Sequence, residues 1–492
     1  MTANIHANIA SITRRHMLFA TLGAGAAASI ITPDTALAGA TPAGWALGVA
    51  DVEVDIPVQN LQRISGRLPA GFGGTLYRNG PAKFRRPGGD GGHWFDGDGL
   101  IRRFHLADGK ATLNARFADT PKRRLETQLN AIVQPGFGTP ERAGSVVMGP
   151  DDCNSANTSI LGVGNEIWAL WEGGSPVRMD AQTLETLGMK TFRRDLKSMP
   201  FLAHPRVQPD GTVWNLGGGG KSAAVWQVKR DGSLASFTMV SLPRTSYFHD
   251  FTATARHIII ILQPWMQEGF KFPLSTAMAW RPEKGTQILV LDKDDLTKRR
   301  TFELPAFSFF HLGDAWEEAD GTIRFDGAFE ADPTFGQTAA SALLRGEFIK
   351  APPPMLTQVV LRPNGTADML ATAVRAEFPA NDKRRAGLPR RYTTHVTHYR
   401  QTPFPHAIAT WDWEKGRDDA HDFGDHQLVE EFLFVPRGAG ENNGWLVGTT
   451  LNLKARATEL HVIDAAHVSH GPVASFRANM PLPLGFHGAF VA

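Results

Sequence analysis

Short β-rich runs separated by glycine-containing turns recur along the chain, and this pattern restricts the possible folds most. Clear examples are residues 166–171, 212–216, 287–291, 322–325 and 444–448. Asp-Gly turns precede two of these runs, and the chain contains 50 Gly and 32 Pro in all. Many short strands joined by such turns predict an all-β sandwich, barrel or propeller. No composition shift follows residue 38, so we expect a single catalytic domain over residues 39–492.

The first 38 residues have the features of a targeting segment. Arg14 and Arg15 stand before an apolar run from Met17 to Ile31, which is too short to span a bilayer. Residues 36–38 form an Ala-Leu-Ala cleavage site. The pattern resembles a bacterial twin-arginine signal and predicts export to the periplasm. An ordinary secretory signal and an uncleaved anchor are the alternatives.

Charge and cysteine content exclude several classes of function. The formal net charge is only +2, which is not the charge of a nucleic-acid-binding surface. Cys153 is the single cysteine, so the chain cannot form an internal disulfide, a zinc finger or an iron–sulfur cluster. Any protein-bound metal therefore has to rest on His, Asp or Glu side chains.

Four of the 17 histidines stand in aromatic-rich, strand-like surroundings: His204, His249, His311 and His487. They are separated by 45, 62 and 176 residues, so no single helix or hairpin can carry them. The spacing fits one ligand from each of four strands around a common axis. A lone buried histidine is more often a hydrogen-bonded core residue, and spacing alone leaves both interpretations open.

A series of motifs resembles the carotenoid cleavage oxygenase family, which includes carotenoid, apocarotenoid and stilbene cleaving enzymes. The N-terminal signature consists of Tyr-Arg-Asn-Gly-Pro at residues 77–81 and His-Trp-Phe-Asp-Gly-Asp-Gly at residues 93–99. Further motifs follow in the family's order at residues 169–174, 203–205, 248–251, 280–286, 310–311, 377–379, 431–437 and 485–488. The resemblance covers nearly all of the chain after the signal.

The resemblance implies a seven-bladed β-propeller in which loops and short helices cap one face over an axial metal site. It implies iron(II) held by His204, His249, His311 and His487. It also implies that Glu172, Glu377 and Glu431 each accept the outer N–H of a ligand histidine, which fixes the ring and raises its basicity. Thr158 is expected to direct its methyl group at an open iron position.

The activity implied is that of a non-haem iron(II) dioxygenase that cleaves a C=C bond of an apolar polyene with O₂. A carotenoid or apocarotenoid is the favoured substrate and a lignostilbene-type stilbene is the alternative. Stilbene-cleaving relatives bind the phenol with a Tyr and a Lys; Lys122 is available, but residues 81–120 contain no Tyr. A non-catalytic, lipid-binding propeller and an isomerase acting without O₂ are further alternatives. The oligomeric state is not predicted.

Three further features of the sequence each allow two interpretations. The apolar segment 264–279 is either a core strand and loop or a tunnel mouth that touches a membrane. Asp314 stands where the family is expected to have Asn, and its carboxylate either adds charge near the site or pairs with an Arg. His93, Asp96 and Asp98 suggest metal ligands, but we favour tight turns whose carboxylates bond backbone amides.

Overall fold

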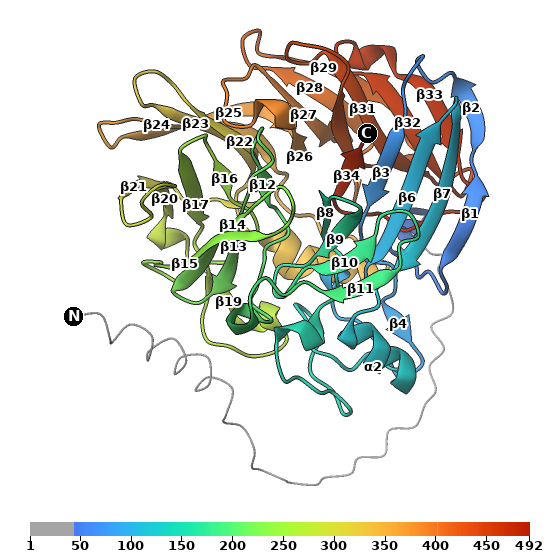
Figure 1. The fold of residues 1–492 in the computed structure, drawn as a ribbon, viewed down its shortest axis with the longest axis horizontal. Helices are drawn as coiled ribbons and strands as arrows, with labels where there is room; N and C mark the ends of the chain where they lie inside the picture. Colours follow the sequence, from blue (N-terminus) through green and yellow to red (C-terminus); the bar gives the residue numbers. More distant parts are fainter. Residues whose placement is uncertain (1–43, 401) are drawn as a thin grey trace. The chain divides into compact units, whose positions relative to one another are not determined.

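The computed structural model describes residues 44–400 and 402–492, so the predicted signal at residues 1–38 lies outside the described part. In that part, seven sheets of four or five antiparallel strands form the blades of a β-propeller, as predicted (Figure 1). The first strands of blades 4, 5, 6, 7, 1 and 2 contact one another in this order around the axis. Within each blade the strands lie outward from this inner strand in the order in which they are named.

Blades 1 to 4 come mainly from the N-terminal half. Blade 1 is β34 (Gly488–Val491), β3 (Gly74–Arg78), β6 (Leu100–Ala107), β7 (Lys110–Phe117) and β1 (Ile56–Asn60). Blade 2 is β8 (Ser159–Val163), β9 (Glu166–Leu170), β10 (Val177–Asp180) and β11 (Thr186–Met189). Blade 3 is β12 (Arg206–Val207), β13 (Val213–Gly219), β14 (Ser222–Val228) and β15 (Leu234–Ser241). Blade 4 is β16 (Thr252–Ala253), β17 (His257–Leu262), β20 (Thr286–Asp292) and β21 (Arg299–Leu304).

Blades 5 to 7 follow in chain order. Blade 5 is β22 (Ser308–Glu317), β23 (Ile323–Glu330), β24 (Met355–Leu361) and β25 (Ala367–Arg375). Blade 6 is β26 (Glu377–Ala380), β27 (Tyr392–Thr397), β28 (Ala407–Asp412) and β29 (Arg417–Asp422). Blade 7 is β30 (Gln427–Pro436), β31 (Gly444–Asn452), β32 (Ala457–Asp464), β33 (Pro472–Arg477) and β2 (Gln62–Gly66). The hairpins β4 (Arg85–Arg86)–β5 (Gly89–Asp90) and β18 (Trp265–Gln267)–β19 (Met278–Trp280) stand apart from the blades.

The ring is closed by strands from both ends of the described chain. The C-terminal strand β34 pairs with β3, with Gly488 opposite Arg78, and β2 pairs with β33 in the last blade. A Cβ atom at residue 488 would collide with the carbonyl group of Tyr77, so the close approach of β34 requires glycine there. Closure pairs edges that would otherwise be open, and it also fixes the residue before β34, which is His487.

The hydrophobic core lies between neighbouring blades. Strand β17 contains four consecutive isoleucines, and all of them are fully buried. Ile259 and Ile261 pack with residues of blade 5, whereas Ile258 and Ile260 pack with residues of blade 3. Because alternate side chains of a strand point to opposite faces, a strand buried on both faces has a continuous apolar run. Each such isoleucine stabilises the fold by roughly 1.5–3 kcal/mol.

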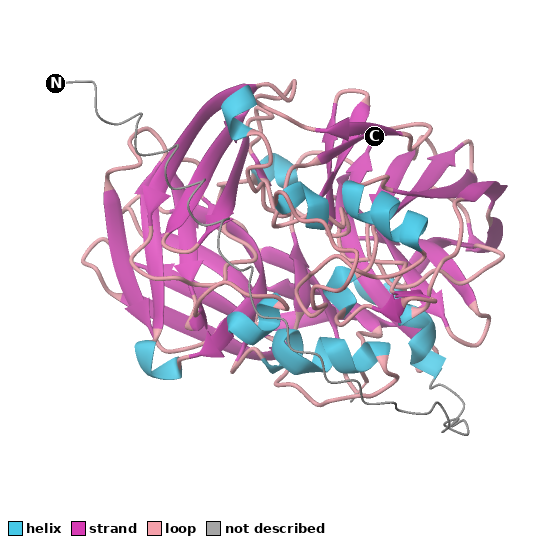
Figure 2. Ribbon diagram, turned by 90° about the horizontal axis from the view of Figure 1, so that it is seen from below, coloured by secondary structure: helices cyan, strands magenta, loops and turns pink. Residues whose placement is uncertain are grey.

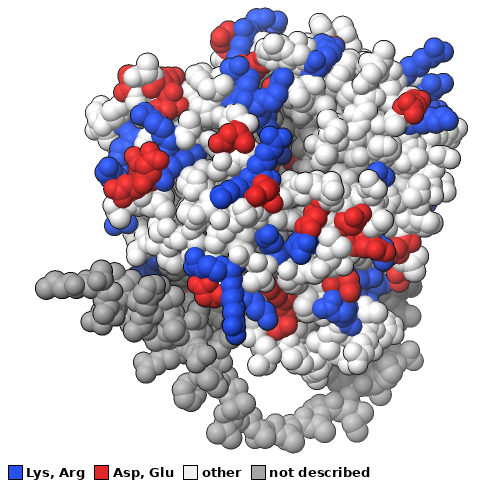
Figure 3. Space-filling model, in the orientation of Figure 1, with Lys and Arg blue, Asp and Glu red and all other residues white. Residues whose placement is uncertain are grey.

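In residues 44–400 and 402–492 helices are few and short; η1 precedes the first strand, and the others lie in the connections between strands (Figure 2). They are α2 (Pro121–Leu129), α3 (Ala340–Leu344), the π-helical turn η7 (Phe335–Ala339) and 3-10 turns at η1 (Gly44–Val49), η2 (Trp94–Asp96), η3 (Pro150–Cys153), η4 (Arg194–Leu196), η5 (Leu274–Ala277), η6 (Pro282–Lys284), η8 (Lys383–Arg385) and η9 (Val468–His470). Among the described residues, none of these helices has the length and apolar character needed to cross a bilayer. On the face drawn in Figure 3, basic and acidic side chains are interspersed.

Candidate metal centre

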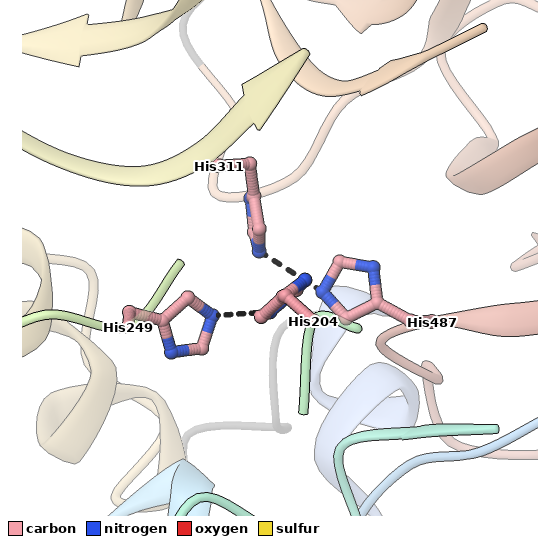
Figure 4. A group of neighbouring side chains, drawn as sticks. All are labelled: His204, His249, His311 and His487. Carbon is pink, nitrogen blue, oxygen red and sulfur yellow. Dashed lines mark hydrogen bonds between the residues drawn. The ribbon is translucent and has the colours of Figure 1, made fainter. Parts of the chain in front are cut away.

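The inner strands of four blades bring the four predicted histidines together. His204, His249 and His487 stand just before β12, β16 and β34, and His311 lies within β22. Their four ligand atoms all lie within 4.8 Å of one another (Figure 4). The Nε2 atoms of His204 and His249 are 2.9 Å apart, and those of His487 and His311 are 3.0 Å apart. Four ring nitrogens from distant segments therefore face one centre.

The three predicted glutamates hold the outer nitrogens of three of these rings. Glu172 contacts Nδ1 of His249, Glu377 contacts Nδ1 of His311, and Glu431 lies 3.1 Å from Nδ1 of His487. Glu377 and Glu431 come from β26 and β30, the inner strands of blades 6 and 7, and Glu172 follows β9 in blade 2. A carboxylate at Nδ1 keeps the proton there, so the Nε2 lone pair is directed at the centre.

Burial and neighbouring charge set the ionisation of the site. Burial and the other three rings hold the pKa of His204 well below its ordinary value. Burial also lowers the pKa of His487 to about 4, although Glu431 opposes this. Burial acts the same way on His311, but Glu377 outweighs it and raises the pKa of that ring. Neutral imidazoles are the form that binds metals, and His204 and His487 are neutral at pH 7.

Two residues of the N-terminal signature, Arg78 and Asn79, hydrogen-bond to groups that lie next to the metal centre. The fully buried Arg78 donates from one guanidinium nitrogen to Oε2 of Glu431 at 2.8 Å and from the other to the carbonyl oxygen of Glu431. Asn79 donates to the carbonyl oxygens of Ala156 and Ser159, on either side of Thr158. Residues 78 and 79 thus orient the carboxylate behind His487 and the loop that carries Thr158.

Thr158 stands beside the predicted ligand His487. It is 6 % exposed, and its carbonyl oxygen accepts the backbone N–H of His487 at 3.1 Å. Its hydroxyl donates to Oδ1 of Asn157 at 3.0 Å. The hydroxyl is therefore engaged away from the ligand ring, and the predicted role of the methyl group stays a proposal.

Tyr247 is a site residue that the sequence reasoning missed. Its hydroxyl donates to Oε2 of Glu172 at 3.0 Å, while the other oxygen of the same carboxylate contacts His249. Burial and the adjacent Glu172 raise the pKa of Tyr247 well above its ordinary value, so the phenol stays protonated. The signal was present in the sequence, because Tyr247 is two residues before His249 and its two neighbouring rings, Phe248 and Phe251, have no hydroxyl.

An aromatic wall lies against one side of the histidines. The ring of Phe310 is 5.3 Å from that of His249, and Trp265 is 4.8 Å from Tyr247. Phe95 and Phe335 pack on Phe310 with centroids 5.7 and 6.0 Å away. Trp265, Met278 and Phe310 form the buried part of this group. Such a wall excludes water and offers apolar contact beside the centre.

The His93–Asp98 block is structural, as favoured, with one correction. Asp96 accepts the backbone N–H groups of Phe137 and Gly138. Asp98, expected to bond backbone amides, instead pairs with the side chains of Lys122, Arg123 and Arg86. This makes it the anchor of helix α2 rather than part of a simple turn.

Lys122 does not fit the role of a phenol-binding residue. Its ammonium group lies 2.8 Å from both Asp98 and Glu126, and its side chain is 4 % exposed. Burial opposes its charge, but the two carboxylates outweigh burial and raise its pKa. Glu126 also accepts the backbone N–H groups of Val133 and Gln134, so it holds Lys122 and the loop after α2 together.

The apolar segment 264–279 forms a hairpin with a buried base and an exposed tip, and its predicted membrane contact stays a prediction. Trp265 and Met278, in the paired strands β18 and β19, are 0 % and 6 % exposed. The tip between these strands is open, and Phe270 is 74 % exposed. Two bonds tie the segment to the loop after α2: the N–H groups of Leu274 and Ser275 donate to the carbonyl oxygens of Gly136 and Phe137.

Comparisons with known proteins agree with this geometry. The profile of the family described as retinal pigment epithelial membrane protein matches residues 49–492. Apocarotenoid-15,15'-oxygenase of Synechocystis is 27% identical over 485 residues, covering 91% of this chain and 94% of that protein. Isoeugenol monooxygenase of Pseudomonas putida is 28% identical (87% and 93% covered), and lignostilbene-alpha,beta-dioxygenase isozyme III of Sphingomonas paucimobilis is 26% identical (86% and 92%).

Solved structures show the same fold. A mutant of the Synechocystis apocarotenoid oxygenase superposes with a TM-score of 0.82 at 24% identity, over 92% of this chain and 99% of that one. The cobalt-substituted form of that oxygenase gives a TM-score of 0.80 at 25% identity with the same coverage. With its propeller, its motifs and its profile match in agreement, the chain belongs to the retinal pigment epithelial membrane protein family, the carotenoid cleavage oxygenase family that its sequence resembles.

Proposed function

We propose that the protein is a non-haem iron(II) dioxygenase that cleaves a C=C bond of an apocarotenoid with O₂ and yields two carbonyl products. The single observation that carries the proposal is the convergence of four Nε2 atoms from four blades on one centre. The relatives named as apocarotenoid, lignostilbene and carotenoid cleavage oxygenases support the reaction class.

The donor set fits a divalent transition metal. Imidazole nitrogens suit iron, zinc, copper and nickel, and the outer nitrogens of His249, His311 and His487 already have carboxylate partners. Cys153 is not a competing ligand, because burial raises the pKa of its thiol to about 12. Bound at His204, His249, His311 and His487, iron(II) would supply the activation of dioxygen, for which side chains have no equivalent.

The chain's own residues position the reactants and keep water out. Glu172, Glu377 and Glu431 hold the protons at Nδ1 of their histidines, so the rings keep one tautomer and one orientation. The wall of Phe310, Trp265 and their neighbours would hold an apolar alkene beside the centre. Thr158, next to His487, is proposed to direct its methyl group at an open coordination position. No side chain has to act as a general base.

The polar groups favour an apocarotenoid over a stilbene. The hydroxyl of Tyr247 is engaged by Glu172, and that of Tyr77 by the carbonyl oxygen of Ala181. Lys122 is engaged by two carboxylates. A phenol-binding Tyr–Lys pair would need a free hydroxyl and a free ammonium group together near the centre. The stilbene alternative draws its support from the lignostilbene relative.

We also propose export and peripheral membrane contact. Export is supported by the twin-arginine pattern at Arg14 and Arg15 and the cleavage site before residue 39. Membrane contact is supported by Phe270, which is 74 % exposed beside Lys271 at the hairpin tip, and by Met148, which is 79 % exposed. The loops that carry them both attach to segment 134–137, through Gln134 and Phe137.

Purified protein and two substrates test the function. The expected preparation holds about one iron per chain and takes up O₂ while the absorbance band of an apocarotenal falls. Both oxygen atoms of ¹⁸O₂ are expected in the carbonyl products, which excludes an isomerase. His249→Ala is expected to lose iron and cleavage together. Loss of a hydroxystilbene band alone would replace the apocarotenoid by a stilbene, and an iron-free chain without O₂ uptake would leave only a binding propeller.

A further inference from the structure

Arg206, on blade 3, lies behind the histidine cluster and contacts blades 4 and 5. It begins β12 two residues after His204, and its side chain is 15 % exposed. Its Nε donates to the carbonyl oxygen of Phe251 at 2.6 Å. One terminal nitrogen donates to Oδ1 of Asp250 at 2.6 Å and to the carbonyl oxygen of Leu312 at 3.2 Å. The guanidinium therefore joins blade 3 to blades 4 and 5.

Each of these acceptors belongs to a residue that stands one or two positions after a cluster histidine in the chain. Asp250 and Phe251 follow His249 along the chain, and Leu312 follows His311. Asp250, 1 % exposed, adds two bonds of its own by accepting the backbone N–H groups of Phe251 and Leu312. The segments that carry three of the four histidines are thus tied to one another by a single arginine and a single aspartate.

Asp314 completes this group on its far side. Its Oδ1 lies 3.4 Å from the remaining terminal nitrogen of Arg206, and its side chain is 20 % exposed. It also lines a polar pocket, together with Asn381, Arg390 and Glu441, three residues beyond His311 along β22. Asp314 therefore faces solvent on one side and Arg206 on the other, which accounts for a carboxylate at the position where the family resemblance implies Asn.

We propose that Arg206 is a positioning residue that sets the spacing of the imidazoles by clamping the segments of His204, His249 and His311, with Asp250 as its principal anchor. This inference rests on the proposed metal centre. A planar guanidinium presents several N–H groups in a fixed fork, so from blade 3 it bonds acceptors on blades 4 and 5 at once. A lysine at the same place keeps the charge but not the fork. Asp314 acts mainly as a counter-charge.

Cobalt(II) binding to the metal-free protein tests the clamp without relying on turnover. The dissociation constant and the visible ligand-field bands of the Co(II) protein are measured for the wild type, Arg206→Met and Arg206→Lys. Arg391→Met is the matched control, because Arg391 also pairs with an aspartate, here through two bonds to Asp412 in blade 6, away from the cluster. Melting of the metal-free variants reports any general loss of stability.

Arg206→Met is expected to weaken Co(II) binding about ten- to hundredfold, the usual effect of losing a partner that orients metal ligands, and to shift the bands. Arg206→Lys is expected to retain only part of the affinity, and Asp314→Asn to stay within about threefold of the wild type. Arg391→Met is expected to bind as the wild type does, even where its melting temperature falls as far.

Wild-type affinity and unchanged bands in Arg206→Met overturn the inference. If that variant does not fold, Asp250→Asn replaces it, since it keeps the shape but removes the charge that pairs with Arg206 and one of the two acceptor oxygens, and unchanged binding there overturns the inference as well. Failure of the metal centre itself gives a different result. In that case the wild type does not bind one Co(II) per chain, or His249→Ala binds it as tightly as the wild type.

Discussion

Replacing Arg78 by methionine is expected to destabilise the metal-free protein through the carboxylate it leaves behind. The side chains of Arg78 and Glu431 are 0 % and 12 % exposed, and the closest nitrogen and oxygen are 2.8 Å apart. At that distance two unit charges attract by about 6 kcal/mol for an effective dielectric constant of about 20. Their desolvation offsets much of this, and breaking a buried pair on one side costs about 3–5 kcal/mol.

The size of this loss sets the assay. Unfolding entropy of about 2.1 cal/mol/K per residue gives roughly 0.9 kcal/mol/K for a domain of about 450 residues. A loss of about 3–5 kcal/mol should therefore lower the melting temperature by about 3–5 °C, measured by circular dichroism at one scan rate. The control is Arg362→Met, because its pair with Asp368 is 41 % and 53 % exposed and is worth at most about 1 kcal/mol.

The pH dependence provides a second check. Burial opposes ionisation of Glu431, but His487 and then Arg78 outweigh it and lower the pKa of the carboxyl group to about 2 from an ordinary 4.5. The pair therefore stabilises the fold above about pH 4.5 and is lost as the pH falls towards 2. The difference between wild type and Arg78→Met should be full at pH 7 and shrink in acid.

A double-mutant cycle isolates the pair itself. Arg78→Met combined with Glu431→Gln should be less destabilised than the two single variants added together, because no unpaired charge stays buried. An Arg78→Met protein that melts within 1 °C of the control, or a cycle without coupling, would refute the reasoning.

Three shorter predictions concern other parts of the molecule. Glu377→Gln should weaken metal binding about 10–100-fold, because it removes the negative charge from Nδ1 of His311; equilibrium titration with Co(II) measures this, and an unchanged dissociation constant contradicts it. Phe270→Ser should reduce sedimentation with lipid vesicles while cleavage in detergent stays the same, whereas Leu370→Ser, 50 % exposed on blade 5, should affect neither. Lys122→Met should cost about 3–5 kcal/mol of stability because two buried carboxylates lose their cation, and a melting curve like that of the wild type would show that the ion pairs carry no net stabilisation.

Local patterns in the sequence were sufficient for the all-β fold class and for four candidate histidines, whose role as ligands the family resemblance implied. Turn-bounded runs such as residues 287–291 became strands, here β20, because alternation and turn chemistry act over a few neighbouring residues. The histidines could be chosen because a polar ring amid apolar residues needs a partner. Motif order, rather than periodicity, indicated the propeller and the number of its blades.

Sequence reasoning could not assign contacts between distant segments. From the sequence Lys122 is available to bind a phenol, but in the fold its ammonium group is enclosed by Asp98 and Glu126. In the sequence Tyr247 is one aromatic residue among several, and its role depends on the hydrogen bond that its hydroxyl donates to Glu172, 75 residues earlier. These pairings depend on which blades become neighbours, and nothing in the local sequence specifies that.

By itself, the sequence determined a chain of short β-strands with one cysteine, a set of histidines suited to a metal and a content of apolar residues suited to an apolar substrate. Only the tertiary structure decided that the four imidazoles face one point, that Arg206 and Arg78 stand behind them, and that Asp314 has a cation to pair with. The physical reason is ring closure. The pairing of β34 with β3 places residue 487 beside residues that are hundreds of positions away. The four imidazoles can face one metal only because this closed ring fixes the direction of each of them.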